Sequence, residues 1–205
     1  SIDSSYLGLW TDIDFCYASH NLPAVDSLNQ LGYCWMEQRF GRDCYRDSLN
    51  IPAVGYILLY GPLVPDPGSI AIYKGLKKVD YKNLPLSAFW GISDDSYPDN
   101  SDYGPAYSRE SAWNISRGLD KLGNVIIDPT TQLPTKFKYS GDPITNSGWL
   151  ANVQQSGGGA GFYMFTGPFN MAPQDTQWVM FALTAAQGGD NLKSITELRR
   201  RAKIL

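Results

Sequence analysis

The chain of 205 residues is poor in glutamate and has no long apolar run. Only Glu37, Glu110 and Glu197 are glutamates among its 20 acidic residues. Glutamate favours helices, whereas aspartate favours caps and turns, and 20 glycines and 13 prolines are spread along the chain. Long helices are therefore not expected. No apolar stretch approaches the roughly 18 residues that a membrane-spanning helix needs, so no span is expected either.

The sequence also lacks the motifs of common catalytic classes. The G-x-S-x-G elbow of hydrolases, the G-x-G-x-x-G fingerprint and the P-loop signature are all absent. The single histidine, His20, lies in a predicted loop. A catalytic Cys–His pair would need this histidine to meet a cysteine in space, for instance Cys16. A solvated loop histidine is the simpler interpretation, so the sequence favours a protein that is not an enzyme.

Charge is scarce and unevenly spread. Charged residues make up 18% of the chain, below the roughly 25% that is usual for globular domains. Residues 1–192 hold 12 basic and 19 acidic residues, a balance of −7, whereas residues 193–205 hold five basic and one acidic residue, a balance of +4. Because binding to nucleic acid needs clustered lysine and arginine, the acidic body argues against nucleic acid as the main partner.

Cysteine is rare, and Cys16, Cys34 and Cys44 form no C-x-x-C pair of the kind that holds haem or zinc. Two interpretations stay open. One disulfide and one free thiol would suit an oxidising compartment. Three small buried apolar residues would need no such compartment.

What the sequence does contain is alternation with a period of two, which is typical of β-strands. Within residues 6–17 one face carries Leu7, Leu9, Thr11, Ile13 and Phe15, and the other carries Tyr6, Gly8, Trp10, Asp12, Asp14 and Cys16. We expect residues 31–40 to return beside this strand, and the segments 162–169 and 176–185 to pair as a hairpin. Further strands are expected at residues 51–60, 70–75 and 84–92, and loops at residues 18–30, 65–68 and 94–105.

Two short helices are expected. Apolar spacing predicts one over residues 108–122, capped by Ser108 and weakened by Gly118. Ser194 and Glu197 have capping-box spacing, which predicts a second helix over residues 194–204 with cations in its last turns. We therefore expect one mostly β domain over residues 1–205, a β-sandwich of Ig-like or jelly-roll-like kind, with the last helix as an appendage or linker.

Aspartates are the residues that best suit a metal. A loop at residues 94–105 is crowded with them, and two more project from one face of the first strand, about 7 Å apart. Calcium prefers such hard oxygen ligands. The spacing of an EF-hand is not met, and a solvated turn accounts for the same pattern. The candidate calcium ligands are Asp12, Asp14, Asp94, Asp95, Asp99 and Asp102.

One group of proteins shares the order of four stretches of this chain: GLWTDID, PAVGYILLYGPLVP, TKFKYSGDPITNSGWL and FTGPFNMAPQDTQWVMFALTAAQGGDNLKSITEL. On these motifs the chain resembles a module of large secreted or cell-surface proteins that carry type IX secretion sorting tails. The resemblance implies a secreted, extracellular or surface location. In that group the first strand leads into an Asp- and Gly-rich loop suited to a cation, whereas here Asp12 and Asp14 are followed only by Asp26.

These observations predict a non-catalytic structural or interaction module of a secreted surface protein, acting in adhesion, matrix formation or self-assembly. Self-association would use the weakly charged hairpin over residues 162–185, or would dock the basic helix 194–205 on the acidic body of a neighbouring copy. Two alternatives stay open. A carbohydrate-binding or weakly glycan-active domain would show exposed Trp or Tyr on one face, and a calcium-stabilised spacer would lose stability on chelation.

Overall fold

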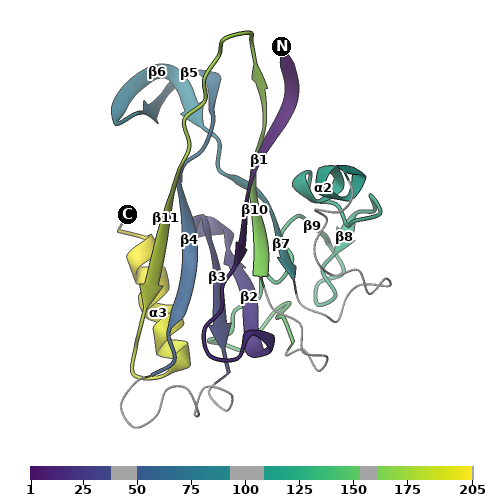
Figure 1. The fold of residues 1–205 in the computed structure, drawn as a ribbon, viewed down its shortest axis with the longest axis vertical. Helices are drawn as coiled ribbons and strands as arrows, with labels where there is room; N and C mark the ends of the chain where they lie inside the picture. Colours follow the sequence, from purple (N-terminus) through teal and green to yellow (C-terminus); the bar gives the residue numbers. More distant parts are fainter. Residues whose placement is uncertain (38–49, 93–108, 153–160, 205) are drawn as a thin grey trace.

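The computed structural model describes residues 1–37, 50–92, 109–152 and 161–204. These residues are mostly β, with several antiparallel sheets and two short helices, as the sequence predicted (Figure 1). One sheet has three strands in the order β1-β10-β7, which are Ile2–Asp12, Gly161–Met171 and Leu86–Ile92. A second sheet has four strands in the order β11-β4-β3-β2, which are Met180–Ala186, Ala53–Tyr60, Leu31–Met36 and Asn21–Asp26.

The remaining strands of the described residues form two smaller sheets. A two-stranded ribbon of β5 (Leu63–Tyr73) and β6 (Leu76–Asn83) extends to one side at the upper end of the molecule in Figure 1. The short strands β8 (Ile126–Ile127) and β9 (Pro134–Thr135) pair near the helix α2 (Arg109–Ser116). The expected loop at residues 65–68 lies within β5.

The two larger sheets pack face to face around a shared apolar core. The three-stranded sheet contributes Phe89, Phe162 and Met164 to this core, and the four-stranded sheet contributes Leu58 among other residues. Gly32 lies opposite the first three, because a Cβ placed there would meet an atom of each at 2.9 Å. The missing side chain at Gly32 therefore leaves room for the larger side chains of the facing sheet.

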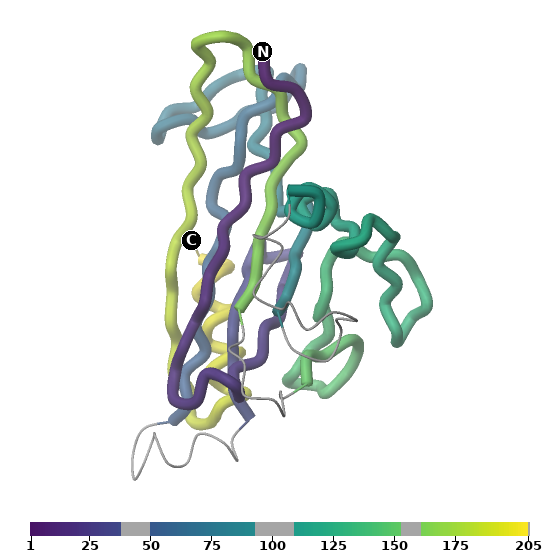
Figure 2. Tube along the Cα trace, turned by 45° about the vertical axis from the view of Figure 1, so that its right-hand side comes forward, coloured from purple at the N-terminus to yellow at the C-terminus, as the bar shows by residue number. Residues whose placement is uncertain are grey.

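Each outer face of the sandwich carries a helix, and the two helices lie on opposite sides of the strands (Figures 1 and 2). The helix α3 (Asn191–Ala202) places Ile195 and Leu198, both 0% exposed, in one core cluster with Tyr33 of the four-stranded sheet. The helix α2 places Ile115 in a cluster with Trp90 of the three-stranded sheet. The helix that was expected as an appendage or linker is thus part of the core.

The expected loop at residues 18–30 is wrong. It contains the 3-10 turns η1 (Ala18–His20) and η2 (Ser27–Asn29), with β2 between them. The next strand, β3, pairs with β2 and β4 and not with β1. Leu22, Ala24 and Val25 are at most 2% exposed, so this strand is buried on both faces. A strand that is buried on both faces does not show the alternation of apolar and polar residues that marks a half-exposed strand, so β2 has no such pattern in the sequence.

The expected hairpin over residues 162–185 is also wrong. The strand β10 pairs with β1 and β7, whereas β11 pairs with β4 in the other sheet. The intervening chain crosses from one sheet to the other around the top of the molecule (Figure 2). Two consecutive apolar strands have the same local pattern whether they pair or cross over, and the segment between them is longer than a tight hairpin turn.

Both helices differ in extent from the expectation. The helix α2 ends at Ser116, and Gly118 follows in the left-handed region at φ +79°. Its expected cap, Ser108, lies outside the described residues. The helix α3 starts earlier than expected, because the Asp190 side chain accepts from the Lys193 N–H at 2.7 Å and caps it. Ser194 instead donates its hydroxyl to the buried carbonyl of Ile51 at 2.7 Å.

Candidate interaction surface

One side of the sandwich is closed by residues 136–139. The Phe89 N–H on β7 donates to the Lys136 carbonyl at 2.9 Å, and the Lys138 N–H donates to the Phe89 carbonyl at 3.2 Å. The Val25 N–H on β2 donates to the Tyr139 carbonyl at 3.3 Å. This segment therefore joins the last strand of each sheet and satisfies backbone groups that would otherwise face water or a partner.

On the opposite side, β1 and β11 are the edge strands of the two sheets among the described residues, and we call this the open side. In the described part of the chain, each of these strands has a neighbouring strand on one side only. Leu183 lies two residues from Phe181 and so on the same face of β11. Phe181 packs against the core between the sheets, yet Leu183 is 63% exposed. The apolar interior is therefore not fully covered along this side.

The composition of the two edges differs. Strand β11 contains no charged residue and no proline, and Arg201 donates to its Ala185 carbonyl at 2.6 Å. Strand β1 carries Asp3 and has register irregularities on either side of Ser5. Charges and bulges are usual devices that protect an edge from pairing with another chain. The edge of β11 is thus the less protected of the two.

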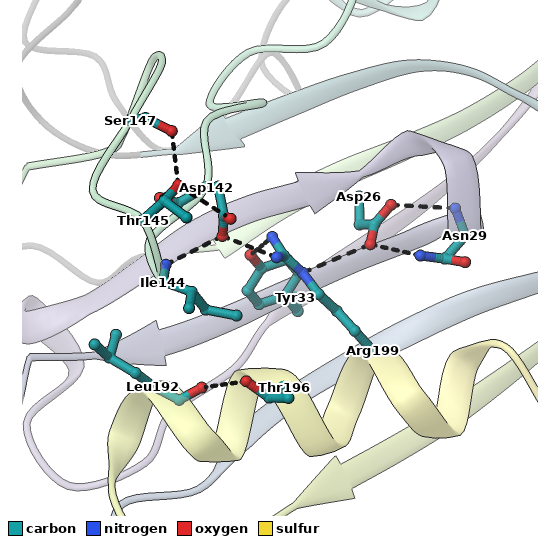
Figure 3. A network of polar contacts seen from close by, with 10 residues as sticks. All are labelled: Asp26, Asn29, Tyr33, Asp142, Ile144, Thr145, Ser147, Leu192, Thr196 and Arg199. Carbon is teal, nitrogen blue, oxygen red and sulfur yellow. Dashed lines mark hydrogen bonds and ion pairs between the residues drawn. The ribbon is translucent and has the colours of Figure 1, made fainter.

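A polar network joins α3 to the four-stranded sheet (Figure 3). Arg199 donates through Nη1 to Asp142 Oδ1 at 2.8 Å and through Nη2 to the Tyr33 hydroxyl at 3.0 Å, and its Nε lies 3.5 Å from Asp26 Oδ2. Both carboxylates also accept from backbone, Asp26 from Asn29 and Asp142 from Ile144. Because these groups are held by one another, we interpret the network as structural.

The protonation of this network follows from its contacts. Burial raises the pKa of Asp142, but the Ile144 N–H and the Arg199 guanidinium outweigh burial and bring that pKa below its usual value. Burial raises the pKa of Tyr33 to about 12, against a smaller opposing effect of Arg199. The cations of the basic helix have partners within the chain: Arg199 pairs with Asp142, and Arg200 and Arg201 pair with Glu197. Docking of this helix on a neighbouring copy stays a prediction.

The predicted metal ligands fall into two groups. Asp12 ends β1 and Asp14 follows it, and both are exposed. Burial, followed by the charge of Asp14, raises the pKa of Asp12, which indicates that the two carboxylates are close enough to repel. The other four, Asp94, Asp95, Asp99 and Asp102, lie outside the described residues. Within the described ranges no group of three or more His, Cys, Asp or Glu could hold a metal ion.

The cysteines follow the first of the two interpretations. Cys16 is disulfide-bonded and Cys34 is a free, fully buried thiol, whereas Cys44 lies outside the described residues. Burial raises the pKa of the Cys34 thiol, and the charges of Asp12 and Asp14 add to the shift. The His20 ring packs edge-on against Tyr17, with centroids 5.8 Å apart.

Cys34 should resist alkylation in the folded protein. It is 0% exposed, and its surroundings disfavour the thiolate that reacts. We expect iodoacetamide at mildly alkaline pH to leave Cys34 unmodified in the native chain and to modify it fully in denaturant. Mass spectrometry of the peptide that contains residue 34 measures this, and equal labelling in both conditions would contradict the buried position.

Comparison of the chain with protein-family models, with curated proteins and with solved structures finds no match. The resemblance to modules of type IX secreted proteins therefore stays a prediction. Across the described residues no helix has the length and apolar character needed to cross a membrane.

The sequence predicts one of the two strands of the open side, but it does not predict how that strand is paired. The sequence predicts self-association through the weakly charged segment over residues 162–185, which contains most of β11. Its partner was expected to be β10, which instead lies at the centre of the other sheet. No local signal marks Leu183 as exposed, since its alternation is that of a residue facing a core.

Proposed function

We propose that the chain is a non-catalytic structural or interaction module of a secreted surface protein, and that it associates with copies of itself by strand pairing at its open side. The observation that carries the proposal is the exposed, uncharged edge of β11 beside an uncovered part of the core at Leu183. An unprotected edge of this kind is a template for pairing with another strand.

A second copy is the partner that this edge fits best. Two β11 edges that meet antiparallel around a two-fold axis present the same surface to each other, so one arrangement satisfies both copies. The exposed backbone groups of each edge would pair, and Leu183 of each copy would leave water. The strand itself contains no charged residue, so the Arg201 side chain, which donates to the Ala185 carbonyl, is the group that would have to move for the two edges to pair along their whole length.

The disulfide at Cys16 supports the extracellular part of the proposal. Disulfides persist in oxidising environments, which include secreted proteins and cell surfaces, and they are rare where thiols are kept reduced. Adhesion and matrix formation are roles that a self-associating module of this kind would serve.

Replacing Leu183 with lysine should convert the assembled protein to monomers. The native mass, measured by light scattering at increasing protein concentration, should rise above that of one chain for the wild type. A lysine at position 183 would lie beside the same lysine of the second copy across the two-fold axis, and the two like charges would prevent burial of the edge. The variant should therefore stay at the mass of one chain.

Leu76→Lys is the matched control, because Leu76 is 73% exposed on the ribbon and the substitution changes the charge equally. It should assemble as the wild type does. A wild-type chain that stays monomeric at its highest soluble concentration would contradict self-association at the open side. The same measurement with a chelator tests the calcium prediction, since a calcium-held assembly would dissociate.

A further inference from the structure

The outer face of the three-stranded sheet carries a row of aromatic side chains. Trp10, Tyr163 and Trp90 occupy neighbouring register positions on β1, β10 and β7. Residues directly opposite one another in a sheet project from the same face, so the three rings form a row across it. The row runs from a buried end to an open one, because Trp90 is 5% exposed and Trp10 is 56% exposed.

The rings of Trp10 and Tyr163 are in contact with each other, and Tyr163 also stacks on Phe165, which is buried at 7% exposure. The ring centroids of Trp10 and Tyr163 lie 6.4 Å apart, and those of Tyr163 and Phe165 lie 5.9 Å apart with nearly parallel planes. Gly8 faces Phe165, and a Cβ at Gly8 would lie 2.7 Å from Cε1 of that ring. A side chain at position 8 would collide with Phe165, so the glycine keeps this part of the face flat.

The helix α2 extends the aromatic surface at Tyr6, near the middle of β1. Trp113 is 44% exposed and meets Tyr6 edge to face, with centroids 5.6 Å apart. The guanidinium of Arg117 lies 5.3 Å from the Trp113 ring centroid. We call this surface the aromatic strip, and its members are Tyr6, Trp10, Trp113 and Tyr163, with the buried Phe165 supporting Tyr163.

Polar groups border the aromatic strip. Asp12 follows Trp10 on the same face of β1, two residues further along. Its carboxylate is exposed, and its closeness to Asp14 makes this end of the strip acidic. The guanidinium of Arg117 lies beside Trp113, and its Nη2 already donates to Asn114 Oδ1 at 2.7 Å. The strip thus combines the exposed rings of Trp10 and Trp113 with a few hydrogen-bonding groups at its margins, and the acidic end disfavours anionic ligands.

We propose that the aromatic strip binds a chain of neutral sugars. The C–H faces of a pyranose ring are apolar and stack on aromatic rings, while its hydroxyl groups need hydrogen-bond partners around the edge. Trp10 and Trp113 provide exposed rings, and Asp12 provides acceptors for hydroxyl groups. The site goes beyond self-association at the strand edges, since the rings project from the face of the sheet and the edge of β11 belongs to the other sheet.

Isothermal titration calorimetry of the whole chain tests this site. The probes are soluble neutral oligosaccharides of glucose, xylose, mannose and N-acetylglucosamine, with heparin as an anionic comparison. We expect at least one neutral oligosaccharide to bind and heparin not to bind. Trp10→Ala should weaken that binding by about tenfold or more, as truncation of a central aromatic contact does, whereas Trp10→Phe should keep part of it.

The variants separate this site from the strand edge and from misfolding. Leu183→Lys should bind the oligosaccharide as the wild type does, and Trp113→Ala should weaken it without change in the circular dichroism spectrum. The proposal is overturned if no neutral oligosaccharide binds, if heparin alone binds, or if Trp10→Ala binds as tightly as the wild type. A monomeric chain that binds the oligosaccharide would refute self-association and support the strip.

Discussion

Arg199→Ala should lower the free energy of unfolding by about 3 kcal/mol, which is the lower end of the range for breaking a buried ion pair. The guanidinium connects α3 to Asp142, to the Tyr33 hydroxyl and to Asp26, and its side chain is only 19% exposed. Its removal leaves two carboxylates and a hydroxyl without this partner. We expect the lower end of that range because the Asp142 side chain is still 34% exposed and so is partly solvated.

Urea unfolding followed by circular dichroism measures the change, and Arg200→Ala is the matched control. Arg200 lies next to Arg199 on the same helix, but its side chain is 58% exposed and pairs with Glu197 at the surface. Surface pairs contribute at most about 1 kcal/mol, and alanine preserves the helix in both variants. Equal losses in the two variants would show that the network does not hold α3 to the sheet.

The same network predicts a loss of stability in acid. The folded-state pKa of Asp142 lies below its unfolded value of about 3.9. Its contribution is therefore present above that pH and disappears as the pH falls through the folded pKa. The wild type should lose stability below about pH 4, and Arg199→Ala should lose less over that range because it has already lost the pair.

Burial of the Tyr33 hydroxyl predicts a loss of stability in base. The folded-state pKa of Tyr33 is raised to about 12, above the unfolded value of about 10. Its contribution is present below about pH 10 and disappears as the pH rises through the folded pKa. Urea midpoints measured across the pH range test both limbs.

Phe162→Ala should lower the free energy of unfolding by about 3–5 kcal/mol, the usual cost of removing a buried aromatic ring. The side chain is 0% exposed and lies between the two sheets, with its ring centroid 5.2 Å from that of Phe89. Because β10 is the central strand of its sheet, the surrounding structure can collapse only partly into the cavity. The loss would be a large part of the total stability of about 5–15 kcal/mol.

Met164→Leu is the control for Phe162→Ala. Met164 lies on the same face of the same strand and is also 0% exposed, but leucine conserves most of its volume. Its cost should stay below about 1.5 kcal/mol. A loss from Phe162→Ala no larger than that of Met164→Leu would contradict a tightly packed core between the sheets.

Local pattern in the sequence was enough for the half-exposed elements. The alternation around Trp10 placed Leu9, Ile13 and Phe15 on one face and Trp10 on the other, and the structure packs the first face against the core and exposes Trp10. The basic C-terminal helix and the mostly β class also followed, because capping, charge and periodicity are properties of neighbouring residues. The cysteine count allowed one disulfide and a free thiol without saying which residue is free.

By itself the sequence determined the mostly β class, most of the half-exposed strands, the approximate places of the two helices and which residues share a face, because these depend on neighbours along the chain. Only the tertiary structure decided which strands pair. It placed β11 away from β10, left Leu183 uncovered and brought Trp113 of α2 against Tyr6. Strand order depends on contacts between residues far apart in the chain, and a fully buried strand such as β2 has no alternation to reveal it.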